Sequence, residues 1–176
     1  MIDYNMKIIG CTGNIDQVTD VITSVNLYAE EESLEIQLFD AHMIFGKPHL
    51  ISAFEHAKRS IQRGENATHS LGMEILLYAS GERQIKKAIK KMGIKQDRTS
   101  FVAIIIHPSE FNDEIDSFIN KFLTDFHLEK NNSVILPDVA MLAEYGISQQ
   151  AIFSVGKDQV FQLVLEKIAL VDVIKK

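Results

Sequence analysis

Apolar runs along the chain predict its strands. Residues 34–39 alternate apolar and polar side chains, which is typical of a strand buried on one face. Residues 101–106, Phe-Val-Ala-Ile-Ile-Ile, form a continuous, mostly β-branched run that indicates a central strand. The run at 73–79 suits either a strand or a buried helix, and a strand is favoured because Ser80-Gly81 closes it. Further strands are predicted at 6–11 and 133–136.

Apolar residues at helical spacing predict helices between these strands. In residues 82–92, Ile85, Ala88, Ile89 and Met92 recur at i, i+3, i+4 and i+7. Further helices are predicted at 15–26 (capped by Asn14), 48–63 (beginning at Pro48), 109–125, 138–145 and 158–174. This order predicts an α/β (α+β) fold. We expect a single domain over residues 1–176, with a mixed sheet of four to five strands and a long apolar C-terminal helix.

Composition supports a globular chain and excludes several classes of protein. The 176 residues are 46% apolar and 24% charged, a composition that is typical of globular proteins and too apolar for a disordered segment. The single cysteine, Cys11, excludes an internal disulfide and a cysteine zinc site, and we expect it to be a small buried residue. No signal peptide or membrane-spanning run is visible, so a cytoplasmic protein is expected.

The net charge of −6 hides an uneven distribution. Residues 1–46 have a net charge of −7, residues 47–98 of +6 and residues 99–176 of −5. An acidic total argues against a nucleic-acid partner, whereas a basic middle segment between acidic flanks restores that possibility.

The basic segment places its charges on two predicted helices. On the first, a polar stripe joins residues that share one side of the helical wheel: His49, Ser52, His56, Arg59 and Arg63. The second contains five basic residues: Arg83, Lys86, Lys87, Lys90 and Lys91. Such faces are usually only solvated, and both readings stay open. Phosphate binding is favoured by the contribution of two helices and by Ser80-Gly81, which we expect to form a helix N-terminus able to hold an anion.

Nothing in the sequence indicates catalysis. His42, His49 and His56 follow Asp40, but His49 and His56 are seven residues apart, about 10.5 Å along a helix, which is too far for a metal pair. No nucleophile, phosphate-loop or dinucleotide motif is present. We therefore expect no enzyme activity, no cofactor and no metal.

The C-terminal helix is more apolar than a surface helix requires. Its apolar residues extend well beyond the stripe of about 100° that packs one face on a core. The helix is either buried deep in its own domain or packed on one side and docked to a partner protein on the other. We favour a partner, because a chain end seldom occupies the centre of a small domain.

A pattern spread over nearly the whole chain resembles a known family. It comprises Asp40-Ala41, Phe45-Gly46, His49-Leu50, Ala53, Ala57, Gly64, Asn66, the segment from Leu71 to Ile85 and the tail from Val164 to Val173. The most specific part is Leu77-Tyr78-Ala79-Ser80-Gly81-Glu82-Arg83-Gln84-Ile85. These residues resemble archaeal members of the PRPK-binding protein family, the small kinase-associated subunit of the KEOPS complex.

The resemblance implies a non-catalytic subunit that binds and modulates a small atypical Ser/Thr kinase-ATPase. The complex installs threonylcarbamoyladenosine at position 37 of tRNA, and the family binds tRNA through its CCA three-prime end. Applied to this sequence, tRNA contact falls on His56, Arg59, Arg63, Ile75, Arg83 and Lys86. Kinase docking falls on Ile152, Leu163, Leu170 and Val171. The alternative is a purely protein-interaction regulator without RNA binding, and an exposed apolar helix would allow a homodimer when the chain is isolated.

Overall fold

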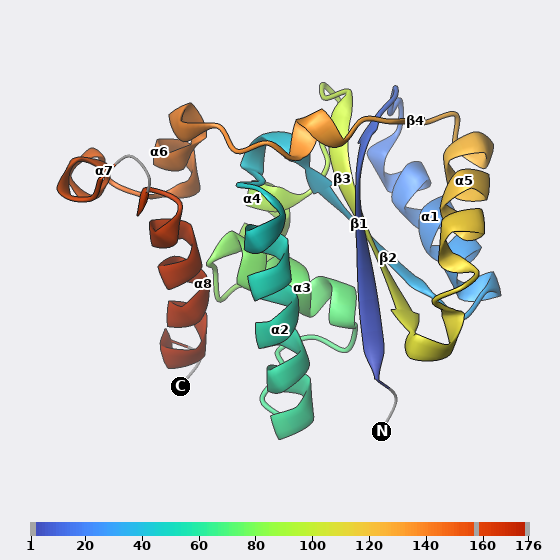
Figure 1. The fold of residues 1–176 in the computed structure, drawn as a ribbon, viewed down its shortest axis with the longest axis horizontal. Coiled ribbons are helices and arrows are strands. Elements are labelled where there is room, and N and C mark those ends of the chain that lie inside the picture. Colours follow the sequence, from blue (N-terminus) through green and yellow to red (C-terminus); the bar gives the residue numbers. More distant parts are fainter. Residues whose placement is uncertain (1–2, 157–158, 175–176) are drawn as a thin grey trace. The chain divides into compact units, whose positions relative to one another are not determined.

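The computed structural model describes residues 3–156 and 159–174 (Figure 1). The chain forms two compact units, each built from two separate stretches. Unit 1 comprises Met1–Ala41 and Ile94–Val134, and unit 2 comprises His42–Gly93 and Ile135–Lys176. The expectation of a single domain stays a prediction. None of the helices in the described part of the chain is long and apolar enough to cross a membrane.

Unit 1 is built on a four-stranded sheet in the order β2-β3-β1-β4. The strands are β1 (Tyr4–Thr12), β2 (Glu35–Asp40), β3 (Ser100–Pro108) and β4 (Glu129–Lys130). β3 is a central strand, as its β-branched run predicts, and its residues from Phe101 to His107 are all buried. The α/β class is confirmed, and the number of strands lies within the expected four to five. The described pairings are all antiparallel, however, so the expected mixture of strand directions is corrected.

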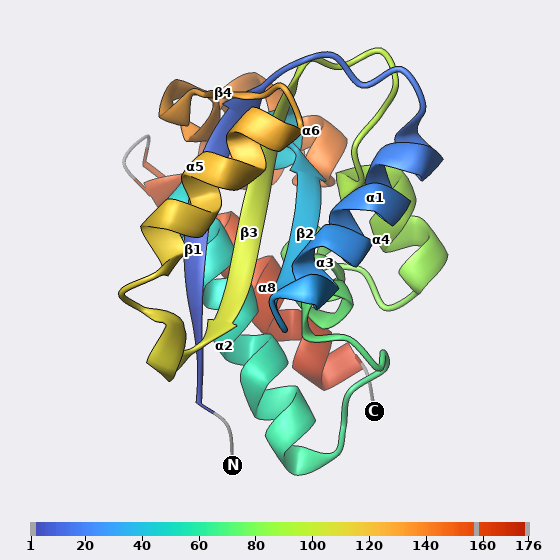
Figure 2. The same ribbon diagram turned by 90° about the vertical axis from the view of Figure 1, so that its right-hand side faces the viewer.

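Two helices cover one face of this sheet, α1 (Val18–Glu31) and α5 (Ile115–Asp125) (Figure 2). They enclose a core of buried apolar side chains from β1, β2, β3 and both helices. Cys11 belongs to this core, as predicted, and burial raises the pKa of its thiol to about 12. A short 3-10 turn, η2 (Ser109–Phe111), precedes α5 where one continuous helix was predicted.

Unit 2 is helical. Its α-helices are α2 (Lys47–Arg63), α3 (Leu71–Ser80), α4 (Ile85–Met92), α6 (Leu142–Tyr145), α7 (Gln149–Ser154) and α8 (Gln162–Ile174). The 3-10 turn η4 (Val139–Met141) precedes α6. Two further 3-10 turns, η1 (Ala41–Met43) and η3 (Asn132–Ile135), include the positions in the sequence at which one unit ends and the other begins. Within unit 2, α8 packs against α2 and α3 (Figure 1).

The sequence predicts α2 almost residue for residue. The helix includes Pro48 in its first turn, where a missing N–H costs nothing. It ends before Gly64, whose left-handed conformation (φ 68°) allows its N–H to bond to the carbonyl of Ile61.

Several predicted elements differ from the structure. The run at 73–79 belongs to a helix, α3. Its residues from Glu74 to Ala79 are all buried, so the sequence shows no helical period there and the prediction of a strand is wrong. Residues 133–136 overlap a 3-10 turn, and the short β4 precedes them. Helix α1 begins at Val18 after Gln17, not after Asn14, and α4 begins at Ile85. The predicted start of the last helix at Asp158 lies outside the described residues.

Candidate functional site

The last helix, α8, is apolar on two sides. Val164, Ile168 and Val171 recur at i, i+4 and i+7 and are at most 1% exposed, so this inner side packs within unit 2. On the outer side, Leu170 is 44% exposed and Val173 is 69% exposed. The helix therefore offers apolar surface to solvent in addition to the surface that it buries.

The residues predicted to dock the kinase do not share one side of α8. Leu163 is half-buried and Leu170 is exposed, and their separation of seven residues places both on the same side of the helix. Val171 is fully buried on the inner side, because one residue turns an α-helix by about 100°. Its assignment as a docking contact is therefore corrected. Ile152 is half-buried on α7, beside the exposed Phe153.

Asp172 connects α8 to α2 and α3 by hydrogen bonds. One carboxylate oxygen accepts a short bond from the hydroxyl of Tyr78 on α3. The other carboxylate oxygen lies 2.7 Å from Nδ1 of His56 on α2, and the ring centroids of His56 and Tyr78 are 5.5 Å apart. Burial and the bond to Asp172 raise the pKa of Tyr78. His56, predicted to contact tRNA, is therefore held in place by the helix that has the apolar outer side.

His49 lies on the buried side of α2, and its predicted place on an exposed polar stripe is corrected. Its Nδ1 accepts the N–H of Phe45 at 3.1 Å, so its Nε2 donates to the carbonyl of Ala79 at 2.8 Å. Burial lowers the pKa of His49 to about 4. The ring is thus a neutral structural group that fixes the end of α3.

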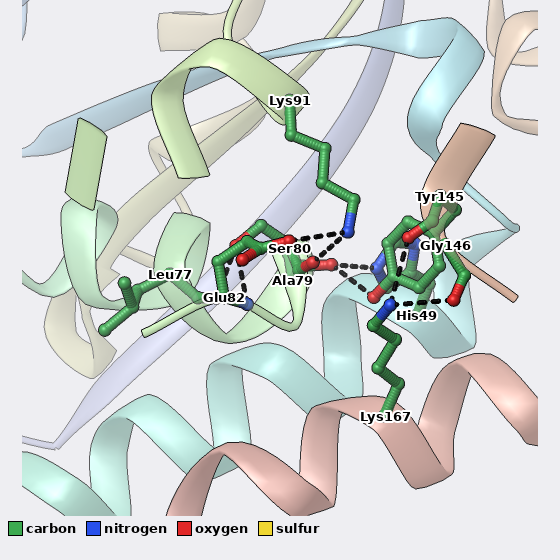
Figure 3. Close-up of polar contacts among 9 residues, drawn as sticks. All are labelled: His49, Leu77, Ala79, Ser80, Glu82, Lys91, Tyr145, Gly146 and Lys167. Atoms are coloured by element: carbon green, nitrogen blue, oxygen red, sulfur yellow. Dashed lines mark hydrogen bonds and ion pairs between the residues drawn. The ribbon is translucent and has the colours of Figure 1, made fainter. Parts of the chain in front are cut away.

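Lys91 fastens the turn between α3 and α4 (Figure 3). Its ammonium group donates to the carbonyl of Ser80 at 2.6 Å and lies 3.3 Å from the carboxylate of Glu82. It also lies 4.1 Å from the centroid of the Tyr145 ring, a favourable cation–π distance. Burial, together with the nearby charge of Lys167, lowers the pKa of Lys91 to about 8. Lys91 is therefore a structural cation and not part of the exposed basic face.

Lys167 of α8 reaches the same region from the other side (Figure 3). Its ammonium group donates to the carbonyls of Tyr145 and Gly146 at 3.2 and 3.1 Å, and the Tyr145 hydroxyl donates to the carbonyl of Ala79 at 2.7 Å. A Cβ at Gly81 would lie 2.8 Å from Cγ of Lys167, and Gly81 has a φ of 65°, which favours glycine. Helix α8 is thus packed directly on the turn that follows α3.

The prediction of an anion site at Ser80-Gly81 is wrong. These residues end α3, and the hydroxyl of Ser80 accepts the N–H of Glu82 while it donates to the carbonyl of Leu77. The end of a helix presents carbonyl oxygens and partial negative charge, which attract cations such as Lys91 rather than anions.

Four of the predicted tRNA-binding residues are exposed cations of unit 2. Arg59 and Arg63 lie one turn apart on α2, and Arg83 and Lys86 flank the start of α4. Within the part of the chain that the structure describes, none of the four has an ion-pair partner. Unit 2 contains 13 of the 18 Lys and Arg residues and 9 of the 24 Asp and Glu residues, a net charge of +4, whereas unit 1 has −10.

Ile75, also predicted to contact tRNA, is fully buried on α3, so its assignment as a surface contact is corrected. Its neighbour Glu74 is equally buried. The Glu74 carboxylate accepts the N–H groups of Ala67 and Thr68 and the hydroxyls of Ser60 and Thr68. A single carboxylate within an apolar run was the available signal for a buried polar anchor of this kind.

The histidines considered as metal ligands, together with Asp40, have separate surroundings. Among residues 3–156 and 159–174, no group of three or more His, Cys, Asp and Glu side chains could hold a metal ion. Asp40 forms an ion pair with Lys95 at 3.1 Å in unit 1, His42 is exposed, and His49 and His56 have separate partners.

Comparison of the sequence with known proteins identifies its family. Residues 14–172 match the family described as kinase binding protein CGI-121. The chain is 33% identical over 145 residues to the regulatory protein Cgi121 of Methanocaldococcus jannaschii. This alignment covers 81% of this chain and 87% of that protein. It is 24% identical over 102 residues to the EKC/KEOPS complex subunit CGI121 of Yarrowia lipolytica, and this alignment covers 58% of this chain and 60% of that protein. The chain therefore belongs to the CGI-121 family of kinase-binding proteins.

Proposed function

We propose that this chain is a non-catalytic regulatory subunit of a KEOPS complex, acting in the cytoplasm in the threonylcarbamoyladenosine modification of tRNA. It docks a small kinase-ATPase through the outer side of α8 and binds tRNA through the exposed cations of unit 2. The observation that supports it most directly is the exposed apolar outer side of α8, on a helix whose inner side is already buried.

Kinase docking falls on the outer side of α8 and on α7. An exposed leucine and valine on a helix already packed on its inner side favour burial against another protein. Leu163, Leu170 and Val173 supply the α8 contacts, and Ile152 with Phe153 supplies those of α7. In the absence of the kinase, the same surface allows the chain to form a homodimer.

RNA binding falls on Arg59 and Arg63 of α2 and on Arg83 and Lys86 near α4. These cations are exposed and belong to the unit with the positive net charge. His56 lies at the edge of this set, oriented by Asp172. Recognition of the CCA three-prime end is the part of the proposal that rests on the family resemblance.

Kinase docking is tested with Leu170→Glu and a matched control. Leu27→Glu introduces the same charge at a leucine that is 58% exposed on α1 of unit 1. We expect Leu170→Glu to weaken binding of the purified kinase-ATPase by about tenfold or more in calorimetry, and Leu27→Glu to leave the affinity within about twofold. Equal affinity for both correctly folded variants, checked by circular dichroism, would contradict docking on α8.

RNA binding is tested with Arg59→Gln and Arg83→Gln against Lys121→Gln, an exposed cation of unit 1. Each unit 2 variant should weaken tRNA binding and reduce the slope of log affinity against log salt by about 0.7–0.9. The control should change neither, and tRNA lacking its CCA end should bind more weakly. If tRNA does not bind the unaltered chain in the presence or absence of the kinase, the alternative of a purely protein-interaction regulator is favoured.

A further inference from the structure

The outer edge of β1 is open over most of its length. The strand has nine residues, but β4 pairs with only Cys11 and Thr12, at one end of it. From Tyr4 to Ile9, β1 therefore lies at the edge of the sheet in the described part of the chain, with β3 on its inner side (Figure 2). The side chains from Tyr4 to Ile8 are half-buried or exposed, whereas seven consecutive residues of β3 are buried. Such an edge can pair with a further strand.

The register of β1 shows which of its backbone groups point outward. In an antiparallel pair, alternate residues direct both their N–H and their carbonyl away from the partner strand. Gly10 does so, because its N–H donates to the side chain of Asn132 and its carbonyl accepts the N–H of Asn131. The pairing with β3 is uninterrupted, so Met6 and Ile8 share this orientation and are about 7 Å apart. Among residues 3–156 and 159–174, these four outward groups have no hydrogen-bond partner.

The opposite edge of the sheet, at β2, is more closed. The same alternation turns the backbone groups of Ile36 and Leu38 away from β3. The carbonyl of Leu38 accepts the side-chain amide of Gln37 at 3.0 Å, and the side chains of Ile36 and Leu38 are at most 5% exposed. The edge at β1 is thus the more accessible of the two.

The segment from Ser109 to Asp116 follows β1 closely and is acidic. The side-chain amide of Asn5 donates to Asn112 at 3.1 Å, and the ammonium group of Lys7 lies 3.8 Å from the carboxylate of Asp116. The segment contains four exposed carboxylates and no basic residue, so its charge of −4 exceeds the +1 of Lys7. These carboxylates belong to Glu110, Asp113, Glu114 and Asp116. An incoming strand therefore meets a negative field beside the open edge.

Charge decides between the ligands that this edge can accept. A second copy of the chain would bring another unit 1, with a net charge of −10, against the first, and like charges disfavour that contact. A lysine on an edge strand often prevents unwanted pairing, but Lys7 is paired with Asp116 and its charge is outweighed. An extended segment with alternating basic side chains is favoured, because its main chain can pair with β1 while its cations approach the carboxylates.

We infer that the outer edge of β1 binds an extended basic segment of another protein as a fifth strand of the sheet. The N–H and carbonyl groups of Met6 and Ile8 hold the main chain of this segment, and the carboxylates between Ser109 and Asp116 select its basic side chains. The site is confined to unit 1 and is independent of the kinase and RNA surfaces proposed for unit 2.

Hydrogen exchange tests the orientation of the edge residue by residue. The probe is an octapeptide of alternating lysine and valine, and NMR measures the exchange of each backbone amide. In the free chain, the amides of Met6 and Ile8 should exchange at least about tenfold faster than those of Asn5 and Lys7, which point toward β3. The peptide should slow the exchange of Met6 and Ile8 by at least about tenfold and leave Asn5 and Lys7, the internal controls, nearly unchanged.

The backbone bond is tested with proline at an outward position. Met6→Pro removes one outward N–H without removing a bond to β3, and Met6→Leu keeps that N–H and serves as the matched control. Fluorescence anisotropy with the labelled peptide should show about fivefold or more weaker binding for Met6→Pro and less than about twofold for Met6→Leu. Circular dichroism checks that both variants fold. If Met6→Pro does not fold, Ile8→Pro with Ile8→Leu as its control makes the same test.

The charge preference is tested separately. The double variant Glu110→Gln/Asp113→Asn should weaken binding of the lysine peptide by about threefold at low salt. The control Glu31→Gln/Asp97→Asn removes two exposed carboxylates elsewhere in unit 1 and should leave the affinity nearly unchanged. An octapeptide with glutamate in place of lysine should bind at least about tenfold more weakly.

Several results would overturn the inference. If the lysine peptide binds without slowing exchange at Met6 and Ile8, it lies elsewhere on the chain. If the glutamate peptide binds as tightly, the carboxylates do not select the ligand. If Met6 and Ile8 become protected when the concentration of the chain alone is raised, the edge pairs with a second copy. Failure of the lysine peptide to bind at millimolar concentration and low salt would also exclude the site.

Discussion

The two units of this chain differ in how they use their apolar residues and their charge. Unit 1 buries its apolar side chains around a sheet and has a net charge of −10, whereas unit 2 is helical and has +4. Of the eleven large apolar residues that are exposed in the described part of the chain, nine lie in unit 2 and two, Ile22 and Leu27, lie in unit 1. This distribution supports the proposal that the kinase and RNA surfaces lie on unit 2.

The largest expected effect comes from the core of unit 1. Phe122 is fully buried on α5, and Phe122→Ala should reduce the free energy of unfolding by about 3–5 kcal/mol through lost burial and a cavity. Leu27→Ala, on the surface of the same unit, should change it by less than about 0.5 kcal/mol. Urea denaturation measures both, and a small loss for Phe122→Ala would show that unit 1 is not the tightly packed unit.

The second effect concerns pH and belongs to unit 2. Because the pKa of His49 is about 4 when folded and about 6.5 when unfolded, the unfolded chain binds more protons between these values. Stability should therefore fall by about 3 kcal/mol as the pH falls from 6.5 to 4. His49→Gln should lose this contribution, so the variant should show a shallower decline in urea denaturation at each pH. Parallel curves for the two proteins would contradict the buried, neutral state of His49.

A smaller effect is expected where α8 joins α2 and α3. Asp172→Ala removes the acceptor for Tyr78 and His56 and should lower the stability of the chain by about 1–2 kcal/mol. Glu166→Ala, at an exposed carboxylate of the same helix, serves as the control and should have almost no effect. Equal thermal shifts in the two variants would show that the contacts of Asp172 add nothing to the packing of α8.

The smallest effect concerns self-association in the absence of a partner. We expect the exposed side of α8 to pair weakly with a second copy of the chain. Leu170→Ser should then raise the dissociation constant of this homodimer a fewfold, as measured by sedimentation velocity of the isolated chain. Leu27→Ser should not. A monomer for all three proteins would limit the role of this surface to the kinase.

The elements that the sequence predicts best are those whose surroundings differ between two sides. β2 alternates and α2 has a distinct apolar arc, so their periods are visible. Helix α3 is buried on nearly every side, which removes its period and leads to the wrong prediction of a strand. Ser70 was a usable signal for the start of α3, because a serine often caps a helix and its side chain here accepts the N–H of Met73.

The candidate site shows the same limit. The sequence correctly identifies α8 as too apolar for an ordinary surface helix, but it does not tell which apolar residues face inward. Only packing against α2 and α3 turns Val171 inside and Leu170 outside. Lys91 and Lys167 likewise resemble ordinary surface lysines in the sequence, and their roles depend on carbonyls that are distant along the chain.

The sequence by itself determined the family, the α/β class, the principal strands and the uneven charge, because these depend on residue types and local periods. The tertiary structure decided which side chains are available to a partner. Exposure depends on which helices pack together. The carbonyls at the ends of α3 and α6 bind the ammonium groups of Lys91 and Lys167 only in the folded chain, because these residues are distant from one another in the sequence.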